Sequence, residues 1–244
     1  MSAPKNMLGT VYALALVIEL FGGLLVASTL RAHPLETLPA LDFVPPPPGS
    51  YKLQRIMAAP DGLVLGINGR SQPLSLYTRG QVTLLGFIYT TCVDPEGCPL
   101  AYRVFDALKT AIAATPALHG KVRLVTLSFD PARDTPEVMR RYAGSRAVDM
   151  SGGLRWYFLT TRSRRELMPL IEGFGQDVRV TFDRSSGRAR RELSHVLKVF
   201  LIDRSGYVRE IYSSLFLHPR TVLNDIETLL MEAGFQPPRA AVVK

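Results

Sequence analysis

Cysteine is scarce in this chain, because only Cys92 and Cys98 occur among its 244 residues. Both stand in the stretch TTCVDPEGCP, separated by VDPEG. A disulfide that closed so short a loop would stabilise the fold little, since the entropic gain grows with loop size. The pair is therefore better explained as a redox pair or as two metal ligands than as a structural disulfide.

Runs of lysine and arginine interleaved with aromatic residues are also missing, although the net charge is +8 and the pI is about 9.7. This absence argues against nucleic-acid binding. The basic surface suits an acidic protein partner or anionic lipid better. No internal repeat is visible, and a hydrophobic content of 47% excludes wholesale disorder. We therefore expect one sizeable domain.

The N-terminal stretch 7–30 is apolar and carries a single charge, Glu19. About 20 apolar residues span a bilayer core, whereas the apolar part of a secretory signal needs only about 7–15. The length predicts that residues 1–30 form a retained anchor or uncleaved signal; cleavage after Ser28 or Ala32 is the alternative. No Arg- and Ser-rich transit stretch precedes it, so we expect a bacterial inner-membrane protein with its soluble part in the periplasm.

Residues 31–50 have no usable periodicity and contain four consecutive prolines, which is typical of a semi-rigid polyproline II spacer. The domain is expected over 51–236, followed by a short tail over 237–244.

Within that domain, apolar runs alternate with segments of helical periodicity. The pattern predicts buried strands at 82–90, 122–129 and 156–161, helices at 99–115, 134–143 and 163–175, a hairpin at 195–214 and a closing helix at 219–234. Strands alternating with helices indicate a mainly parallel central sheet flanked by helices. With the C-terminal hairpin and helix, this is an α/β, thioredoxin-like fold, preceded by one transmembrane helix. A small extra hairpin is expected within 51–80.

The two cysteines occupy a strand-to-helix crossing. Cys92 follows a buried strand and Cys98 precedes a helix, at the carboxyl edge of the sheet, where α/β proteins place their chemistry. The residues Asp-Pro-Glu-Gly at 94–97 fit a type I turn, which would bring the two cysteines together. At the N-cap of its helix, Cys98 would lie in a positive potential that favours the thiolate.

Of the four histidines, His195 is the one expected near the cysteines. It begins the strand HVLKVFLID, whose start should lie beside the strand-to-helix loop, whereas His33, His119 and His218 occupy linker or turn positions. Two thiolates and an imidazole form a soft site that suits Cu(I) and can hold Cu(II) with an added oxygen ligand. Zinc usually requires a fourth protein ligand.

Three motifs together resemble the Sco/SenC family of copper-binding, thioredoxin-like proteins. They are FIYTTCVDPEGCPL, SFDPARDTPEVMRRYA and SHVLKVFLIDRSGYV, in that order, and the resemblance covers roughly residues 62–234. It implies one copper held by Cys92, Cys98 and His195. It also implies a role in assembling the binuclear copper centre of cytochrome c oxidase, with the copper-bearing oxidase subunit and other periplasmic copper carriers as partners.

The chain departs from the family pattern in two places. The usual spacing is C-x₃-C, whereas this chain has C-x₅-C, and the longer loop offers Asp94 or Glu96 as an oxygen ligand. An aspartate often precedes the histidine, where this chain has Ser194. Asp130 and Asp134, in the second motif, are interpreted as turn and cap residues.

Three functions remain open at this point. The first is a copper metallochaperone, a binding and transfer protein rather than a turnover enzyme. The second is a membrane-anchored thiol–disulfide oxidoreductase that uses Cys92 and Cys98 as a redox-active pair to reduce cysteines of an oxidase subunit. A peroxidase of peroxiredoxin type is disfavoured, because the loop lacks the Pro-x-x-x-Thr/Ser-x-x-Cys pattern.

Overall fold

The computed structural model describes residues 38, 40–147, 154–183 and 190–235. The chain divides into two units, Met1–Thr37 and Leu38–Lys244, and the elements given below belong to the second. Among the described residues, no helix is long and apolar enough to cross a bilayer, and the anchor expected over 7–30 lies outside them.

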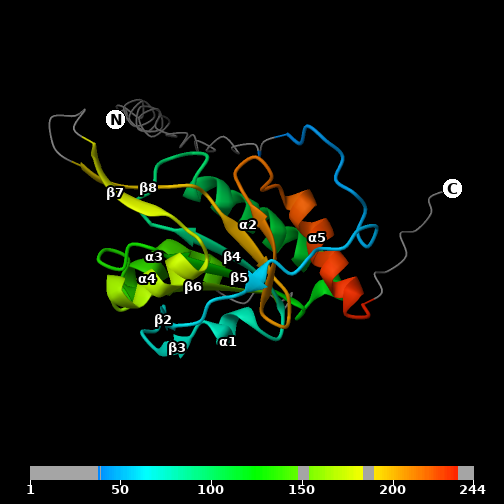
Figure 1. The fold of residues 1–244 in the computed structure, drawn as a ribbon, viewed down its shortest axis with the longest axis horizontal. Coiled ribbons are helices and arrows are strands. Elements are labelled where there is room, and N and C mark those ends of the chain that lie inside the picture. Colours follow the sequence, from blue (N-terminus) through cyan, green and yellow to red (C-terminus); the bar gives the residue numbers. More distant parts are fainter. Residues whose placement is uncertain (1–37, 39, 148–153, 184–189, 236–244) are drawn as a thin grey trace, which may run out of the picture. The chain divides into compact units, whose positions relative to one another are not determined.

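An eight-stranded sheet forms the centre of this unit, with the strand order β1-β10-β9-β4-β5-β6-β2-β3 (Figure 1). Its strands are β1 (Met57–Ala58), β2 (Leu63–Gly66), β3 (Ser71–Pro73), β4 (Val82–Ile88), β5 (Val122–Ser128), β6 (Arg155–Thr160), β9 (Val199–Ile202) and β10 (Tyr207–Tyr212). The helices are α1 (Ser75–Thr78), α2 (Cys98–Ala113), α3 (Pro136–Ala143), α4 (Arg164–Gly173) and α5 (Pro219–Glu232), with 3₁₀ turns at Pro116–Leu118 and Gly144–Ala147.

The sheet is mixed rather than mainly parallel. Only β4, β5 and β6 run parallel to one another, while β9, β10 and β1 on one side and β2 and β3 on the other add antiparallel pairs. The expected parallel arrangement therefore holds for the three central strands, each followed by a helical crossover. The flanking pairs β9–β10 and β2–β3 are hairpins, and tight turns can only join antiparallel strands; β1 adds to the outer edge of β10.

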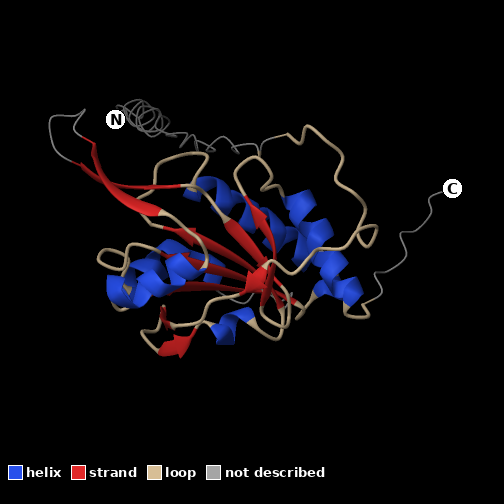
Figure 2. Cartoon of the chain, in the orientation of Figure 1, coloured by secondary structure: helices blue, strands red, loops and turns tan. Residues whose placement is uncertain are grey.

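Helices lie on both sides of the sheet (Figure 2). Two apolar cores cover its two faces, as the continuous apolar runs predicted. Every residue of β4 and β5 is buried. Along β4, Leu84 faces the core that contains α2, α3 and α5, whereas Leu85 and Phe87 face the core that contains α1 and α4. This alternation follows from the two-residue period of a strand.

The proline-rich segment lies against the domain. Pro45 is buried, the carbonyl oxygen of Pro46 accepts a hydrogen bond from the Asn224 side chain (2.8 Å), and the Gly49 amide donates to Thr228 Oγ1 (3.0 Å). Both partners are on α5. Packing in this structure thus extends N-terminally beyond Tyr51, where the domain was expected to start.

A second, two-stranded hairpin, β7 (Val178–Asp183) and β8 (Arg190–His195), lies apart from the main sheet and was not predicted. His195 ends β8 instead of beginning the next strand, and β9 starts only at Val199. The expectation that His195 opens the terminal hairpin was therefore wrong. Its place beside the cysteine loop, described next, arises from a different strand.

Candidate metal centre

The cysteine loop leaves the end of β4 and folds back on itself. The Cys92 amide donates to the Tyr89 carbonyl oxygen (3.2 Å), and the Gly97 amide donates to the Asp94 carbonyl oxygen (3.0 Å). The Asp94 carboxylate also accepts from the Glu96 amide (3.1 Å). These bonds close the turn that the sequence predicted at 94–97.

Cys98 is the first residue of α2, and Gly97 is its N-cap, one position earlier than expected. The Cys98 side chain is buried, with 1% of its surface exposed, whereas Cys92 is half-buried. Neither cysteine forms a disulfide in this structure. The buried sulfur is fixed by the helix, and the more exposed one is carried by the loop.

His195 presents its ring to the cysteines from the end of β8. Its Nδ1 lies 3.1 Å from the Leu193 carbonyl oxygen, and its Nε2 lies 3.7 Å from Cys98 Sγ. A carbonyl oxygen can only accept a hydrogen bond, so Nδ1 carries the proton and Nε2 turns its lone pair towards the sulfurs. The Leu193 carbonyl thus orients the ring, as a second-shell partner does for a ligating histidine.

Two aromatic rings hold the imidazole in place. The centroid of the Phe129 ring lies 4.7 Å from that of His195, and the Tyr89 ring lies edge-on at 5.8 Å. Burial, followed by the negative charge of Cys92, raises the pKa of the Tyr89 hydroxyl, so Tyr89 stays protonated and can donate to that sulfur. The contact of Tyr89 and Phe129 with His195 was not predicted, because both residues come from the ends of strands that look purely structural in the sequence.

The three expected ligands come together. The sulfur atoms of Cys92 and Cys98 and a ring nitrogen of His195 all lie within 4.8 Å of one another. Two sulfurs and one imidazole nitrogen at this spacing can share a single soft metal ion. Asp94 and Glu96 are not members of this group, and the Asp94 carboxylate is already engaged in the turn.

The two cysteine sulfurs share one proton, which stays on Cys98. A hydrogen bond from Cys98 lowers the pKa of Cys92 to about 5, with backbone amides adding to the effect against the cost of burial. The same bond, together with burial and the negative charge of Cys92, raises the pKa of Cys98 above its ordinary value. The metal-free pair is therefore a Cys92 thiolate beside a protonated Cys98, and a metal ion that uses both sulfurs must displace that proton.

Asp134 anchors the start of the cysteine loop. Its buried carboxylate accepts from the Thr90 amide (3.0 Å), from the Thr90 hydroxyl (2.5 Å) and from the Ser128 hydroxyl (2.5 Å). Thr90 is two positions before Cys92, and Ser128 ends the neighbouring strand β5. The interpretation of Asp134 as a turn residue was therefore incomplete, because its side chain joins the cysteine loop to the next strand.

The other residues of that motif and the other described histidines have local roles. Asp130 accepts turn hydrogen bonds through its carbonyl oxygen from the amides of Arg133 and Asp134. Thr135 caps α3 as predicted, and His218 caps α5 by accepting from the Arg220 amide (3.1 Å). His33 lies outside the described residues.

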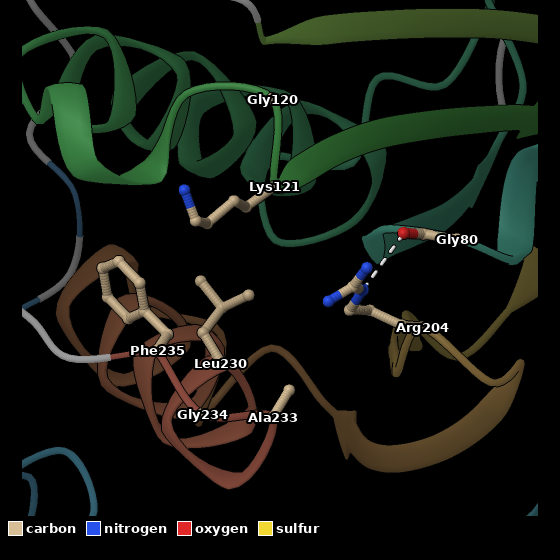
Figure 3. Close-up of a pocket in the computed structure, with 8 residues that line it drawn as sticks. All are labelled: Gly80, Gly120, Lys121, Arg204, Leu230, Ala233, Gly234 and Phe235. Atoms are coloured by element: carbon tan, nitrogen blue, oxygen red, sulfur yellow. Dashed lines mark hydrogen bonds between the residues drawn. The ribbon is translucent and has the colours of Figure 1, made fainter.

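A hollow of about 450 Å³ lies elsewhere, where the sheet meets the C-terminal end of α5 (Figure 3). Lys121 and Arg204 line it together with Leu230 and Phe235, and Arg204 donates to the Gly80 carbonyl oxygen (3.2 Å). None of the described residues that line it is a cysteine, histidine or carboxylate. This hollow therefore offers no side-chain ligand for a soft metal.

A thioredoxin-like fold that carries two cysteines and a histidine at one sheet edge defines a class of thiol- and metal-handling proteins. Residues 73–231 match the family model SCO1/SenC, and the chain belongs to this family. No match was found among curated proteins.

Solved structures with the same fold include ScoI from Bradyrhizobium japonicum with copper bound, at 19% identity and a TM-score of 0.53, covering 68% of this chain and 99% of that chain. ScoI from Arabidopsis thaliana with copper bound has 18% identity, a TM-score of 0.54, and coverage of 72% and 99%. A SCO1/SenC family lipoprotein from Bacillus anthracis str. Ames has 21% identity, a TM-score of 0.58, and coverage of 74% and 99%.

The shared proton gives a testable pH dependence. The pKa of Cys92 is lowered, so its thiolate persists down to about pH 5 in the metal-free protein, and alkylation by iodoacetamide should reach half of its maximal rate there. In Cys98→Ala the hydrogen bond is gone, and the midpoint should rise towards the ordinary thiol value of about 8.5. Mass spectrometry of the alkylated site over a pH series measures both; an ordinary midpoint in the parent protein would refute the shared-proton arrangement.

The Asp134 anchor is tested by Asp134→Ala. The change leaves the buried Ser128 hydroxyl and the Thr90 amide without their acceptor, so unfolding in urea should cost about 1–3 kcal/mol less than in the parent protein. The freed loop should also expose Cys98 to thiol reagents. Glu137→Gln, an exposed carboxylate on α3, is the matched control and should leave both stability and thiol exposure unchanged. If the two variants have the same stability and the same thiol exposure, Asp134 does not support the cysteine loop.

Proposed function

We propose that this protein is a copper metallochaperone that binds one copper ion through Cys92, Cys98 and His195. The observation that carries the proposal is the convergence of two sulfurs and an oriented imidazole nitrogen within 4.8 Å. Sulfur ligands suit Cu(I), and the imidazole adds a donor that Cu(II) accepts well. Family membership and copper-bound neighbours of the same fold support copper as the cargo.

The unequal burial of the ligands suits transfer rather than permanent storage. Cys92 is half-buried on a loop and its neighbour Val93 is 67% exposed, whereas Cys98 is closed off by α2. An incoming ligand from an acceptor protein can therefore replace the Cys92 sulfur first, while Cys98 and His195 still hold the ion. Such stepwise exchange keeps the metal coordinated throughout the transfer.

We further propose that the acceptor is the copper-bearing subunit of cytochrome c oxidase, and that other periplasmic copper carriers supply the ion. In this proposal residues 7–30 span the bacterial inner membrane once and the domain lies on the periplasmic side. The support is the length of the apolar stretch and the role that the family resemblance implies.

A thiol–disulfide reductase is the second candidate, and the lowered pKa of Cys92 favours it. In that reaction the Cys92 thiolate would attack a partner disulfide, and Cys98 would then displace the reduced partner thiol, leaving Cys92 and Cys98 oxidised. This exchange needs the two sulfurs alone and gives no role to His195, whose oriented ring nitrogen lies within 4.8 Å of them. The site therefore fits the donor function better.

The ligand set predicts the copper content of variants. The parent protein should bind one copper, and Cys92→Ser, Cys98→Ser or His195→Ala should each weaken binding by more than the roughly 10–100-fold typical of losing a second-shell contact, because each removes a direct ligand. The sulfur changes should dominate for Cu(I) and the histidine change for Cu(II). Competition titrations with a chromophoric chelator measure this, and His218→Ala is the matched control. If His195→Ala binds both copper states as tightly as the control, the three-ligand site is wrong.

Donor and reductant are separated by growing variant strains at graded copper. We expect His195→Ala to lose oxidase activity at limiting copper almost as fully as Cys92→Ser or Cys98→Ser. Added copper should rescue the histidine variant in part, because its cysteines can still collect abundant metal. A reductant would give the opposite pattern, with normal oxidase in His195→Ala at every copper level and failure only in the cysteine variants.

A further inference from the structure

Four exposed apolar side chains form what we name the apolar edge patch, which consists of Phe43, Val44, Leu215 and Phe216. Their exposed fractions are 42%, 80%, 81% and 54%. The rings of Phe43 and Phe216 are paired, with centroids 6.4 Å apart, so the two chain segments meet. Single exposed apolar residues are ordinary on a protein surface, but a gathered set of large ones marks a surface that is covered in function.

The patch lies at the same edge of the sheet as the cysteine loop. Strand β10 pairs antiparallel with β9, which pairs antiparallel with β4, so β10 and β4 run in the same direction. The loop after β10, which carries Leu215 and Phe216, therefore emerges at the edge where the cysteine loop follows β4 (Figure 1). Exposed Val93 and Val196, the neighbours of Cys92 and His195, continue this edge.

The length of the chain before the patch indicates what covers it. Leu38 packs against the core, so only residues 31–37 separate it from the end of the apolar stretch 7–30. Fully extended, these eight steps reach at most about 29 Å. If 7–30 spans a bilayer, the domain cannot leave its surface by more than that distance. Phe43 and Val44 are among the first residues to follow this tether.

We infer that the apolar edge patch rests in the membrane interface, so that the domain lies with its metal-site edge towards the bilayer. This inference depends on the membrane anchorage proposed above. The net charge of +8 suits a membrane with anionic headgroups. A protein partner explains the patch less well, because it gives no reason for half of the patch to follow so closely after the tether.

The test uses the full chain reconstituted in phosphatidylcholine–phosphatidylglycerol vesicles, with and without lipids brominated close to the headgroup. Bromine quenches tryptophan emission only at contact. Leu215→Trp places a reporter in the patch, and Leu76→Trp places one on α1, ahead of the amino end of β4, at another exposed leucine (55%). The buried Trp156 contributes the same background to both variants.

We expect brominated lipid to remove most of the added emission of Leu215→Trp and little of that of Leu76→Trp. Adding Phe216→Ser to Leu215→Trp should reduce the quenching. That result would show that the native patch, rather than the introduced indole, drives insertion into the membrane interface. If the protein floats with the vesicles but the two reporters are quenched equally, or neither is quenched, the inference is wrong. The patch would then be better explained as a binding surface for a protein partner. Protein that does not float with the vesicles would contradict both the membrane anchor and this inference. Copper binding by the same preparation would still support the metal site.

Discussion

The buried carboxylate of Asp134 is the constraint on which the geometry of the metal centre depends. It accepts hydrogen bonds from Thr90 at the start of the cysteine loop and from Ser128 at the end of β5. Because β4 and β5 are adjacent parallel strands, this one side chain fixes the point where the loop leaves the sheet. Burying a carboxylate is unfavourable unless its oxygens accept hydrogen bonds. The bonds from Thr90 and Ser128 therefore stabilise the buried Asp134, and Asp134 in turn holds those two residues together.

Besides the Asp134 anchor, the main feature of the site is that its two sulfurs differ in burial and in protonation. Cys98 is immobilised by a helix and keeps its proton, whereas Cys92 is carried by a loop and is the thiolate. In the proposed copper site, Cys98 is thus the fixed ligand and Cys92 is the one open to exchange. His195, oriented by the Leu193 carbonyl and held between two rings, supplies a third donor that does not depend on the cysteine loop.

Sequence reasoning identified the central strands and their helices because each is a continuous apolar run or a helical repeat, such as β4 and α2. It also selected the two cysteines and His195, because thiols and imidazoles are the side chains that bind soft metals. It could not foresee the β7–β8 hairpin, whose strands include polar stretches such as RREL and lie off the main sheet. Nor could it find the bond between Asp134 and Thr90, since residues 44 positions apart meet only through strand pairing.

The longer cysteine spacing shows why separation along the chain is a poor measure of distance at a metal site. The family resemblance implies three residues between the cysteines, and this chain has five. The additional length is taken up by the hydrogen-bonded turn from Asp94 to Gly97, where the Asp94 side chain also binds the Glu96 amide. With this turn in place, the two sulfurs lie within 4.8 Å of each other and of the imidazole nitrogen. Asp94 thereby shapes the loop, and it is not a member of the group formed by the two sulfurs and the imidazole.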